Sequence, residues 1–178
     1  MLLRDVRFRS LSRALAGGVI VVSALLVLPQ ASLAADMADI RKLIAEDRMF
    51  DAFRELMPLA QSGNAEAQYE LAGFYQWGTV GAANFTKARQ WYERAAKQGN
   101  VDAMIGLAIM NGYGQGGQVD RREAVKWLVI ASTQQKILPA DEAETIRRKR
   151  DQLAEGLSPQ DMETILTETR NFTPKPEN

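Results

Sequence analysis

The sequence contains neither cysteine nor histidine, and its formal net charge is zero. Without these two residue types the chain can build no disulfide, no Cys/His zinc site, no thiol nucleophile and no His-based catalytic triad. The balance of 22 basic and 22 acidic residues argues against a nucleic-acid partner, because nucleic-acid-binding proteins need a basic face. The sequence therefore predicts no metal and no cofactor, and it leaves carboxylates, lysines and hydroxyl groups for chemistry.

Residues 1–34 have the pattern of a secretory signal peptide. Four arginines and one aspartate precede an apolar or small stretch, residues 14–28, that ends at a proline. Ser32 and Ala34 are the small residues expected before a cleavage point between Ala34 and Ala35. The apolar stretch is shorter than the roughly 18–20 residues of a spanning helix, so cleavage is favoured over retention as an anchor, which stays the alternative. We therefore expect an exported, periplasmic protein that has no membrane span after cleavage and a mature net charge of −3.

The remaining sequence repeats with a period of 36 residues. Within each unit, apolar residues recur at spacings of three and four, which predicts two helices per unit. One such hairpin cannot bury its apolar face alone, but stacked neighbours share a continuous core, so a fixed period of this length indicates an all-α repeat architecture. The residues that recur identically one period later are Gly63, Asn64, Ala67, Leu71, Ala72, Gly78, Ala88, Trp91 and Ala95.

Eleven residues of the first unit fit a known repeat pattern: Ala67, Leu71, Tyr75, Gly78, Lys87, Ala88, Trp91, Tyr92, Ala95, Ala96 and Gly99. On these residues the unit resembles the Sel1-like repeat family, which is related to the tetratricopeptide (TPR) repeats. The second unit departs from the family pattern at Asn111, Glu123, Leu128 and Ser132, where the pattern has Tyr, Lys, Tyr and Ala. The resemblance covers about residues 48–135 and implies an α/α solenoid, and members of this family are mostly binding scaffolds rather than enzymes.

Periodicity and resemblance together divide the chain into six segments. The segment at the C-terminal end is polar and contains two prolines, so we expect it to fray. The sequence indicates no oligomeric state. The predicted segments are a signal peptide (1–34), a degenerate N-terminal half repeat (35–62), a first repeat (63–98), a second repeat (99–134), C-terminal capping helices (135–172) and a disordered tail (173–178).

The resemblance also implies a binding surface, because in tetratricopeptide geometry the first helix of each pair lines a concave groove. The alternative is that Tyr69 and Trp77 pack on the preceding helix pair. Gly73 and Gly106 lie on the same face, and a glycine inside a helix suggests that a backbone or ligand approaches closely there. The predicted groove residues that bind the partner are Tyr69, Glu70, Gln76, Trp77, Ile105, Ile109 and Tyr113.

We therefore expect a non-catalytic scaffold or adaptor that binds a protein or peptide in the cell envelope, with a role in envelope assembly or cell-wall turnover. The alternative is a small carboxylate-based hydrolase that acts on cell-wall glycan or peptide. Glu66 and Glu70 lie one helical turn apart and could do acid/base work, although acids at this spacing are ordinary on exposed helices. No nucleophile–base set accompanies them, so the sequence favours a protein that is not an enzyme.

Overall fold

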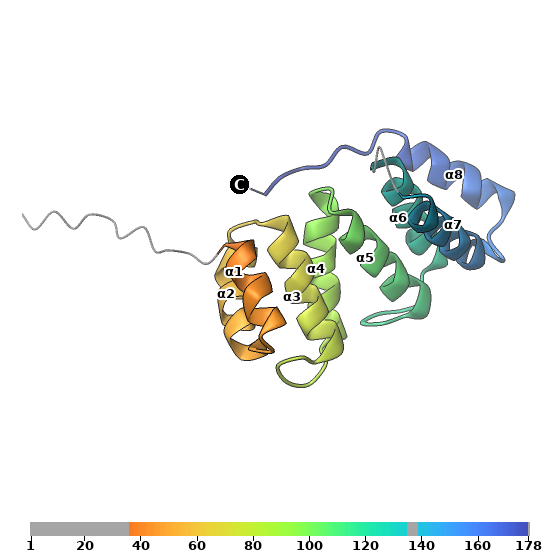
Figure 1. Cartoon of the computed structure of the whole chain (residues 1–178). Helices are drawn as coiled ribbons and strands as arrows, with labels where there is room; N and C mark the ends of the chain where they lie inside the picture. Colours follow the sequence, from red (N-terminus) through yellow and green to blue (C-terminus); the bar gives the residue numbers. More distant parts are fainter. Residues whose placement is uncertain (1–35, 135–138, 178) are drawn as a thin grey trace, which may run out of the picture. The chain divides into compact units, whose positions relative to one another are not determined.

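The computed structural model describes residues 36–134 and 139–177, and these residues belong to one compact unit. They form helices joined by turns and contain no strand, which confirms the all-α prediction. The first six helices follow one another in chain order (Figure 1). The helices are α1 (Met37–Ala45), α2 (Met49–Gln61), α3 (Ala65–Trp77), α4 (Phe85–Lys97), α5 (Val101–Tyr113), α6 (Arg121–Gln134), α7 (Ala140–Ala154) and α8 (Pro159–Thr169).

The 36-residue period is visible in how the helices begin and end. The side chains of Asn64 and Asn100 each accept a hydrogen bond of 2.8 Å from the amide three residues later, which caps α3 and α5. Gly78 and Gly114 end the same two helices in the left-handed conformation, with φ of 65° and 71°. Equivalent residues of the two units therefore begin and end their helices in the same way.

Small residues allow the helices of each hairpin to approach closely. Ala67 and Ala72 of α3 and Ala88 and Ala95 of α4 are all fully buried, as are the alanines one period later. The helix pairs α3–α4 and α5–α6 form the two hairpins, and α4 packs on α5 to join them. The solenoid predicted from the repeats is thus confirmed as a stack of helical hairpins with a continuous core.

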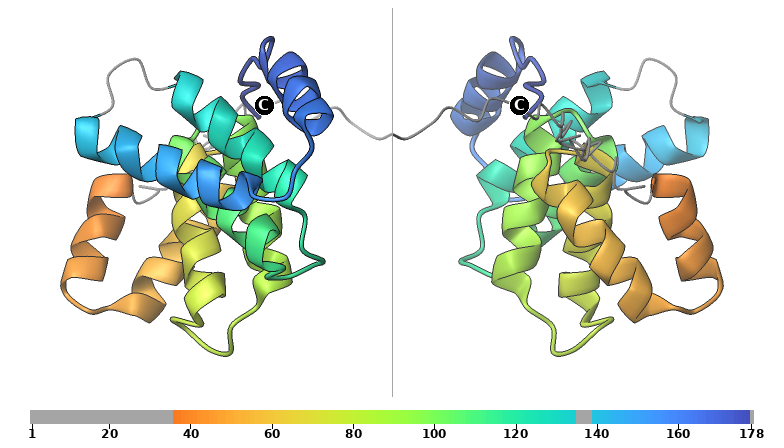
Figure 2. Two further views of the ribbon diagram at one scale, coloured as in Figure 1. Left: turned by 90° about the vertical axis from the view of Figure 1, so that its right-hand side faces the viewer. Right: turned by 90° about the vertical axis from the view of Figure 1, so that its left-hand side faces the viewer.

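Additional helices flank the two hairpins. The α1–α2 pair packs against α3 and lies within the segment predicted as a degenerate half repeat. At the other end α7 runs across the row of helices (Figure 2) and contacts α6 and α5, where Leu153 fills the space beside Gly112. The short helix α8 then packs on α6.

The C-terminal segment differs from the prediction that it frays. Residues 173–177 lie in an extended conformation along the helix ends, and the amide of Lys175 donates a hydrogen bond of 2.9 Å to the carbonyl of Lys97. Phe172 packs edge-on against Trp127, with ring centroids 6.0 Å apart. The two prolines prevent helix formation, but they also keep the segment extended, and its partners lie far away in the sequence.

The predicted signal peptide lies outside the described residues. Among the helices that the structure describes, none combines the length and the apolar character that crossing a membrane requires.

Candidate functional site

Two adjoining hollows border the outer face of α5. The first has a volume of about 350 Å³ and lies between α3 and α5, above Tyr92 of α4. The second has a volume of about 260 Å³ and lies between α5 and α7. Asp102, Ile105 and Ile109 line both hollows, so the two are continuous across α5, and we call them together the groove.

Five of the seven predicted binding residues line the first hollow: Tyr69, Gln76, Trp77, Ile105 and Ile109. The helical register explains this, because residues three, four or seven apart share one face of a helix. Trp77 is 78% exposed, so a large apolar side chain stands at the rim of the groove. The alternative that Trp77 packs on the preceding helix pair therefore does not hold, whereas Tyr69 is half-buried and contacts Tyr92, with ring centroids 5.9 Å apart.

Gln76 is part of the floor of the groove rather than an exposed anchor. Its side chain is buried, and its Oε1 accepts a hydrogen bond of 2.9 Å from the hydroxyl of Tyr92. Its Nε2 donates a bond of 3.0 Å to Oε1 of Gln115, in the turn after α5. The buried Gln76 amide therefore fixes the positions of Tyr92 and of the turn after α5.

Glu70 and Tyr113 do not line the first hollow. Tyr113 is 50% exposed and contacts Lys149 of α7, whose Nζ lies 3.4 Å from the phenol oxygen and 5.6 Å from the ring centroid. Because Lys149 lines the second hollow, Tyr113 is joined to the groove through this cation. Glu70 is half-buried on α3, beside Tyr69 in the sequence.

The glycine at position 106 is explained by packing within the chain. A Cβ atom at this position would lie 3.0 Å from Cε1 of Tyr92, and two further ring atoms would lie within 3.2 Å. At Gly73 the nearest atom, the Tyr92 hydroxyl, would be 3.9 Å away, which is ordinary contact. The close approach expected at Gly106 is therefore made by the Tyr92 ring rather than by a backbone or a ligand, whereas the structure shows no such close approach at Gly73 among the described residues.

Sequence reasoning missed the part of the groove that α7 provides. Asp141, Glu142, Thr145 and Lys149 of this helix line the second hollow, whereas α7 carries no repeat signature that would predict its position. Tyr92 was also missed as a groove residue, because its place in the repeat pattern marks it as core. Nothing in the sequence around Tyr92 indicates that its ring reaches the first hollow, between α3 and α5.

The charges around the groove are mainly negative. Asp102, Asp141 and Glu142 line it, with Lys149 as the one basic lining residue that the structure describes. Burial raises the pKa of the nearby Glu70 carboxyl, and the like charges of Glu66 and Asp102 raise it further against the opposing effect of Arg41. Burial likewise raises the pKa of both Tyr69 and Tyr92, so the two phenols stay neutral at physiological pH.

The pair of carboxylates considered for acid/base chemistry has two different environments. Glu66 forms an ion pair with Arg41 of α1, whereas Glu70 accepts no hydrogen bond from the described residues. Within the described ranges there is no group of three or more Asp or Glu residues placed to hold a metal ion. What the groove offers is apolar surface, hydrogen-bonding groups and negative charge, which suit binding.

A larger hollow of about 630 Å³ lies between α2 and α4 and is lined by both cations and aromatic rings. Two of its cations already contact aromatic rings within the chain. Lys87 lies 5.1 Å from the ring centroid of Tyr75, and the guanidinium of Arg94 lies 4.5 Å from that of Trp91. These cation–π contacts engage the Lys87 and Arg94 side chains within the chain, so the groove on α5 is the stronger candidate for the predicted binding surface.

These stacked hairpins, with a groove bordered by the first helix of each pair, define a helical-repeat solenoid. The Sel1 repeat family model matches residues 65–100 and 101–135, the two hairpins described above. The chain therefore carries two repeats of the Sel1-like family, as the resemblance indicated.

Known relatives match part of this chain rather than the whole of it. Protein sel-1 homolog 2 of Mus musculus is 30% identical over 82 residues, which cover 46% of this chain and 12% of the mouse protein. An uncharacterised protein of Neisseria meningitidis serogroup B is 36% identical over 81 residues, 46% of this chain and 17% of that protein. The chain therefore matches less than a fifth of the length of either relative.

Among solved structures, a protective antigen of uropathogenic Escherichia coli that displays an SLR fold is similar to this chain. The two superpose with a TM-score of 0.66 at 21% sequence identity, over 78% of this chain and 30% of the antigen. At this identity the likeness establishes a shared fold.

Proposed function

We propose that this chain is a non-catalytic scaffold that binds a protein or peptide segment along the groove. The observation that carries the proposal is that Tyr69, Trp77, Ile105 and Ile109, from two successive repeats, line one hollow. Aromatic side chains in or beside a pocket commonly dominate the free energy of binding. Sel1 repeats commonly mediate protein–protein interaction, which is consistent with this use.

The partner that we propose carries aliphatic or aromatic side chains next to a lysine or arginine. The apolar floor formed by Ile105 and Ile109 would accept the former, and the acids Asp102, Asp141 and Glu142 would attract the latter. Complementary charge of this kind steers association and selects among partners more than it raises affinity. A basic residue in the groove would also favour ionisation of Glu70.

We further propose that the protein acts in the cell envelope, in assembly or cell-wall turnover, after export directed by residues 1–34. The support for this proposal is the order of basic, apolar and small residues in that segment. N-terminal sequencing of the protein recovered from the periplasmic fraction tests it. We expect the chain to begin at Ala35, whereas recovery of the intact Met1 terminus would contradict cleavage.

The experiment that tests the groove is a double substitution, Tyr69→Ala with Trp77→Ala. We expect it to abolish partner capture in envelope crosslinking while the helical circular dichroism stays unchanged, because both side chains lie at the groove surface. Phe50→Ala is the matched control, since Phe50 is an aromatic residue with 75% exposure on α2, outside the groove. Unchanged capture by the double variant would remove the proposal.

The alternative, a carboxylate-based hydrolase of cell-wall glycan or peptide, has one supporting observation. Glu70 is half-buried, and burial raises its pKa, which is the direction of shift that a carboxyl group needs to act as a general acid. Turnover of peptidoglycan by the purified protein that is lost in Glu70→Gln would favour the hydrolase. Absence of turnover together with groove-dependent capture would favour the scaffold.

A further inference from the structure

The C-terminal segment after α8 crosses the edge of the solenoid at regular contact points. Phe172 packs on Trp127 of α6, Pro174 lies against Gly99, and Glu177 lies against Gly63. A Cβ atom at Gly99 would come within 2.9 Å of Pro174, and one at Gly63 within 3.1 Å of Glu177. The glycines that end α2 and α4, one period apart, thus provide the space in which the segment lies.

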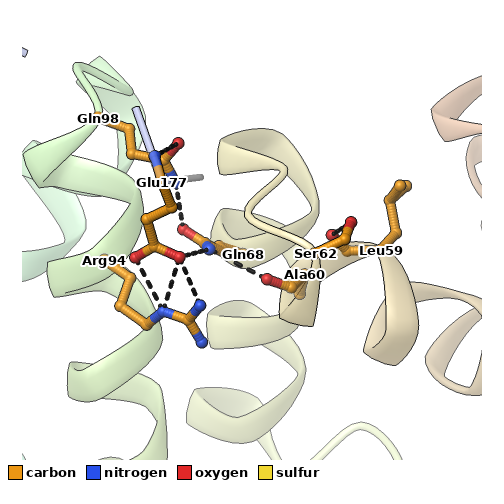
Figure 3. A network of polar contacts seen from close by, with 7 residues as sticks. All are labelled: Leu59, Ala60, Ser62, Gln68, Arg94, Gln98 and Glu177. Carbon is orange, nitrogen blue, oxygen red and sulfur yellow. Dashed lines mark hydrogen bonds and ion pairs between the residues drawn. The ribbon is translucent and has the colours of Figure 1, made fainter. Parts of the chain in front are cut away.

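The segment ends in a cluster of polar side chains (Figure 3), where the Glu177 carboxylate lies between Arg94 and Gln68. Nε of Arg94 donates a hydrogen bond of 3.0 Å to Oε1 of Glu177, and its Nη2 forms an ion pair with Oε2. Nε2 of Gln68 donates to the same Oε2 at 2.9 Å and to the carbonyl of Ala60 at 3.0 Å. Gln98 completes the cluster, because it donates to Gln68 at 2.8 Å and accepts from the Glu177 amide at 3.2 Å.

Comparison of the two repeats shows that this cluster is specific to the first one. One period later, Met104 stands in place of Gln68 and Ile130 in place of Arg94, and both are buried apolar residues. The second repeat therefore has buried apolar side chains where the first has a fully buried amide and a guanidinium. Because a buried amide needs a partner for each of its hydrogen atoms, Gln68 and Arg94 are suited to a carboxylate at this position.

We propose that Gln68, Arg94 and Gln98 form a binding site for an acidic residue on an extended peptide, and that the chain's own tail is its resident, exchangeable occupant. The spacing of the docked residues defines the ligand as an aromatic residue, a proline two positions later and a glutamate three positions after that. This site lies on the edge that carries the α2–α3 and α4–α5 turns and shares none of its three residues with the groove.

The tail is suited to exchange because side chains, rather than regular backbone pairing, make most of its contacts. Among the described residues, the tail backbone donates two hydrogen bonds to the helices, from Lys175 to the carbonyl of Lys97 and from Glu177 to Gln98, and the Lys175 and Pro176 side chains are exposed. The Arg94–Glu177 pair is itself partly exposed, at 37% and 31% for the two side chains. A peptide with the same three docking residues can therefore replace the tail without unfolding a helix.

A fluorescent peptide with the sequence of residues 171–178 tests this proposal by anisotropy on the full chain. Glu177→Gln removes the carboxylate of the resident tail, and we expect this variant to bind the peptide at least tenfold more tightly than the wild-type chain. The same peptide with glutamine in place of glutamate should bind the variant at least tenfold more weakly. Lys175→Ala is the matched control in the tail, and it should bind as the wild type does, because the Lys175 side chain is exposed.

Two further variants locate the site. Gln68→Met and Arg94→Gln, each combined with Glu177→Gln, should lose the peptide, and circular dichroism verifies that each variant is folded. Arg94→Gln keeps the test valid if Gln68→Met alters the core, because Arg94 is partly exposed. Equal binding by the wild type and Glu177→Gln, binding that is insensitive to the glutamate of the peptide, or binding by neither chain would overturn the proposal and make the tail a fixed structural cap.

Discussion

The hydroxyl of Tyr92 in α4 donates a hydrogen bond of 2.9 Å to Oε1 of Gln76 in α3, beneath the groove. This bond holds the Tyr92 ring against Gly106 of α5, so one side chain of the core sets the depth of the groove. The residues that a partner would touch are thus positioned by a buried polar pair, of which the repeat pattern specifies Tyr92 but not Gln76.

Gly106→Ala should lower the free energy of unfolding by about 1–2 kcal/mol, although alanine is the better helix former by about 1 kcal/mol. The added Cβ would lie 3.0 Å from a ring that its hydrogen bond to Gln76 prevents from moving. Gly73→Ala is the control, because its Cβ would meet only the Tyr92 hydroxyl at 3.9 Å, and it should be neutral or stabilising. Urea denaturation of both variants checks this, and equal effects would contradict the packing explanation.

Asn111→Leu should raise the free energy of unfolding by about 1–3 kcal/mol. Asn111 is buried in α5, and neither its Nδ2 nor its Oδ1 has a hydrogen-bond partner among the described residues. Leucine removes these unpaired polar atoms at similar volume. Gln68→Leu is the contrasting control, since Gln68 is buried with its amide fully hydrogen-bonded and should lose stability. A destabilised Asn111→Leu would show that the Asn111 amide has a partner in solution.

Trp127→Ala should cost about 3–5 kcal/mol, whereas Trp91→Ala should cost less, about 1–2 kcal/mol. The two tryptophans are equivalent in the repeat, but Trp127 is 6% exposed beneath Phe172, and Trp91 is only half-buried. Thermal and urea unfolding of the two variants measure the difference. Equal losses would contradict the unequal burial.

Glu70→Gln should stabilise the protein at pH 7 and lose this effect below pH 4.5, the usual pKa of a glutamate. Because burial raises the pKa of Glu70, the folded state binds the proton more tightly than the unfolded state does. The wild type therefore loses stability as the pH rises from 4.5 through the folded-state pKa. Unfolding measured from pH 3.5 to 8 checks this, with Glu168→Gln, at an exposed ion pair with Arg122, as the control. A stability difference that does not change with pH would contradict it.

The repeat core could be predicted from the sequence because local rules determine it. Small residues at a fixed period, caps at Asn64 and Asn100, and glycines after the helices act within a few residues of their own positions. The resemblance to tetratricopeptide geometry indicated which face of α3 and α5 borders a groove, and helical spacing selected the residues on that face, five of which line the first hollow.

The features of the groove and of the tail that the sequence did not predict depend on contacts between distant parts of the chain. No local pattern encodes the position of α7 at the groove. The same is true of the hydrogen bond between Gln76 and Gln115, which belong to different repeats. The prediction that the tail frays was wrong for the same reason. Glu177 bonds to Gln68, which lies 109 positions away in the sequence, and no local pattern reveals that contact. Its composition is that of a terminal coil, and its partners become apparent only in three dimensions.

Selection of binding sequences from an array of random peptides, applied to the wild-type chain and to Asp102→Lys, tests the central claim most directly. We predict that peptides bound by the wild type carry a lysine or arginine beside an aliphatic or aromatic residue, and that Tyr69→Ala with Trp77→Ala releases them. Asp102→Lys should shift the preference toward acidic residues, because Asp102 lines both hollows. Peptides that bind all three chains equally, or that keep the same charge preference on Asp102→Lys, would contradict the assignment of the groove as the binding site.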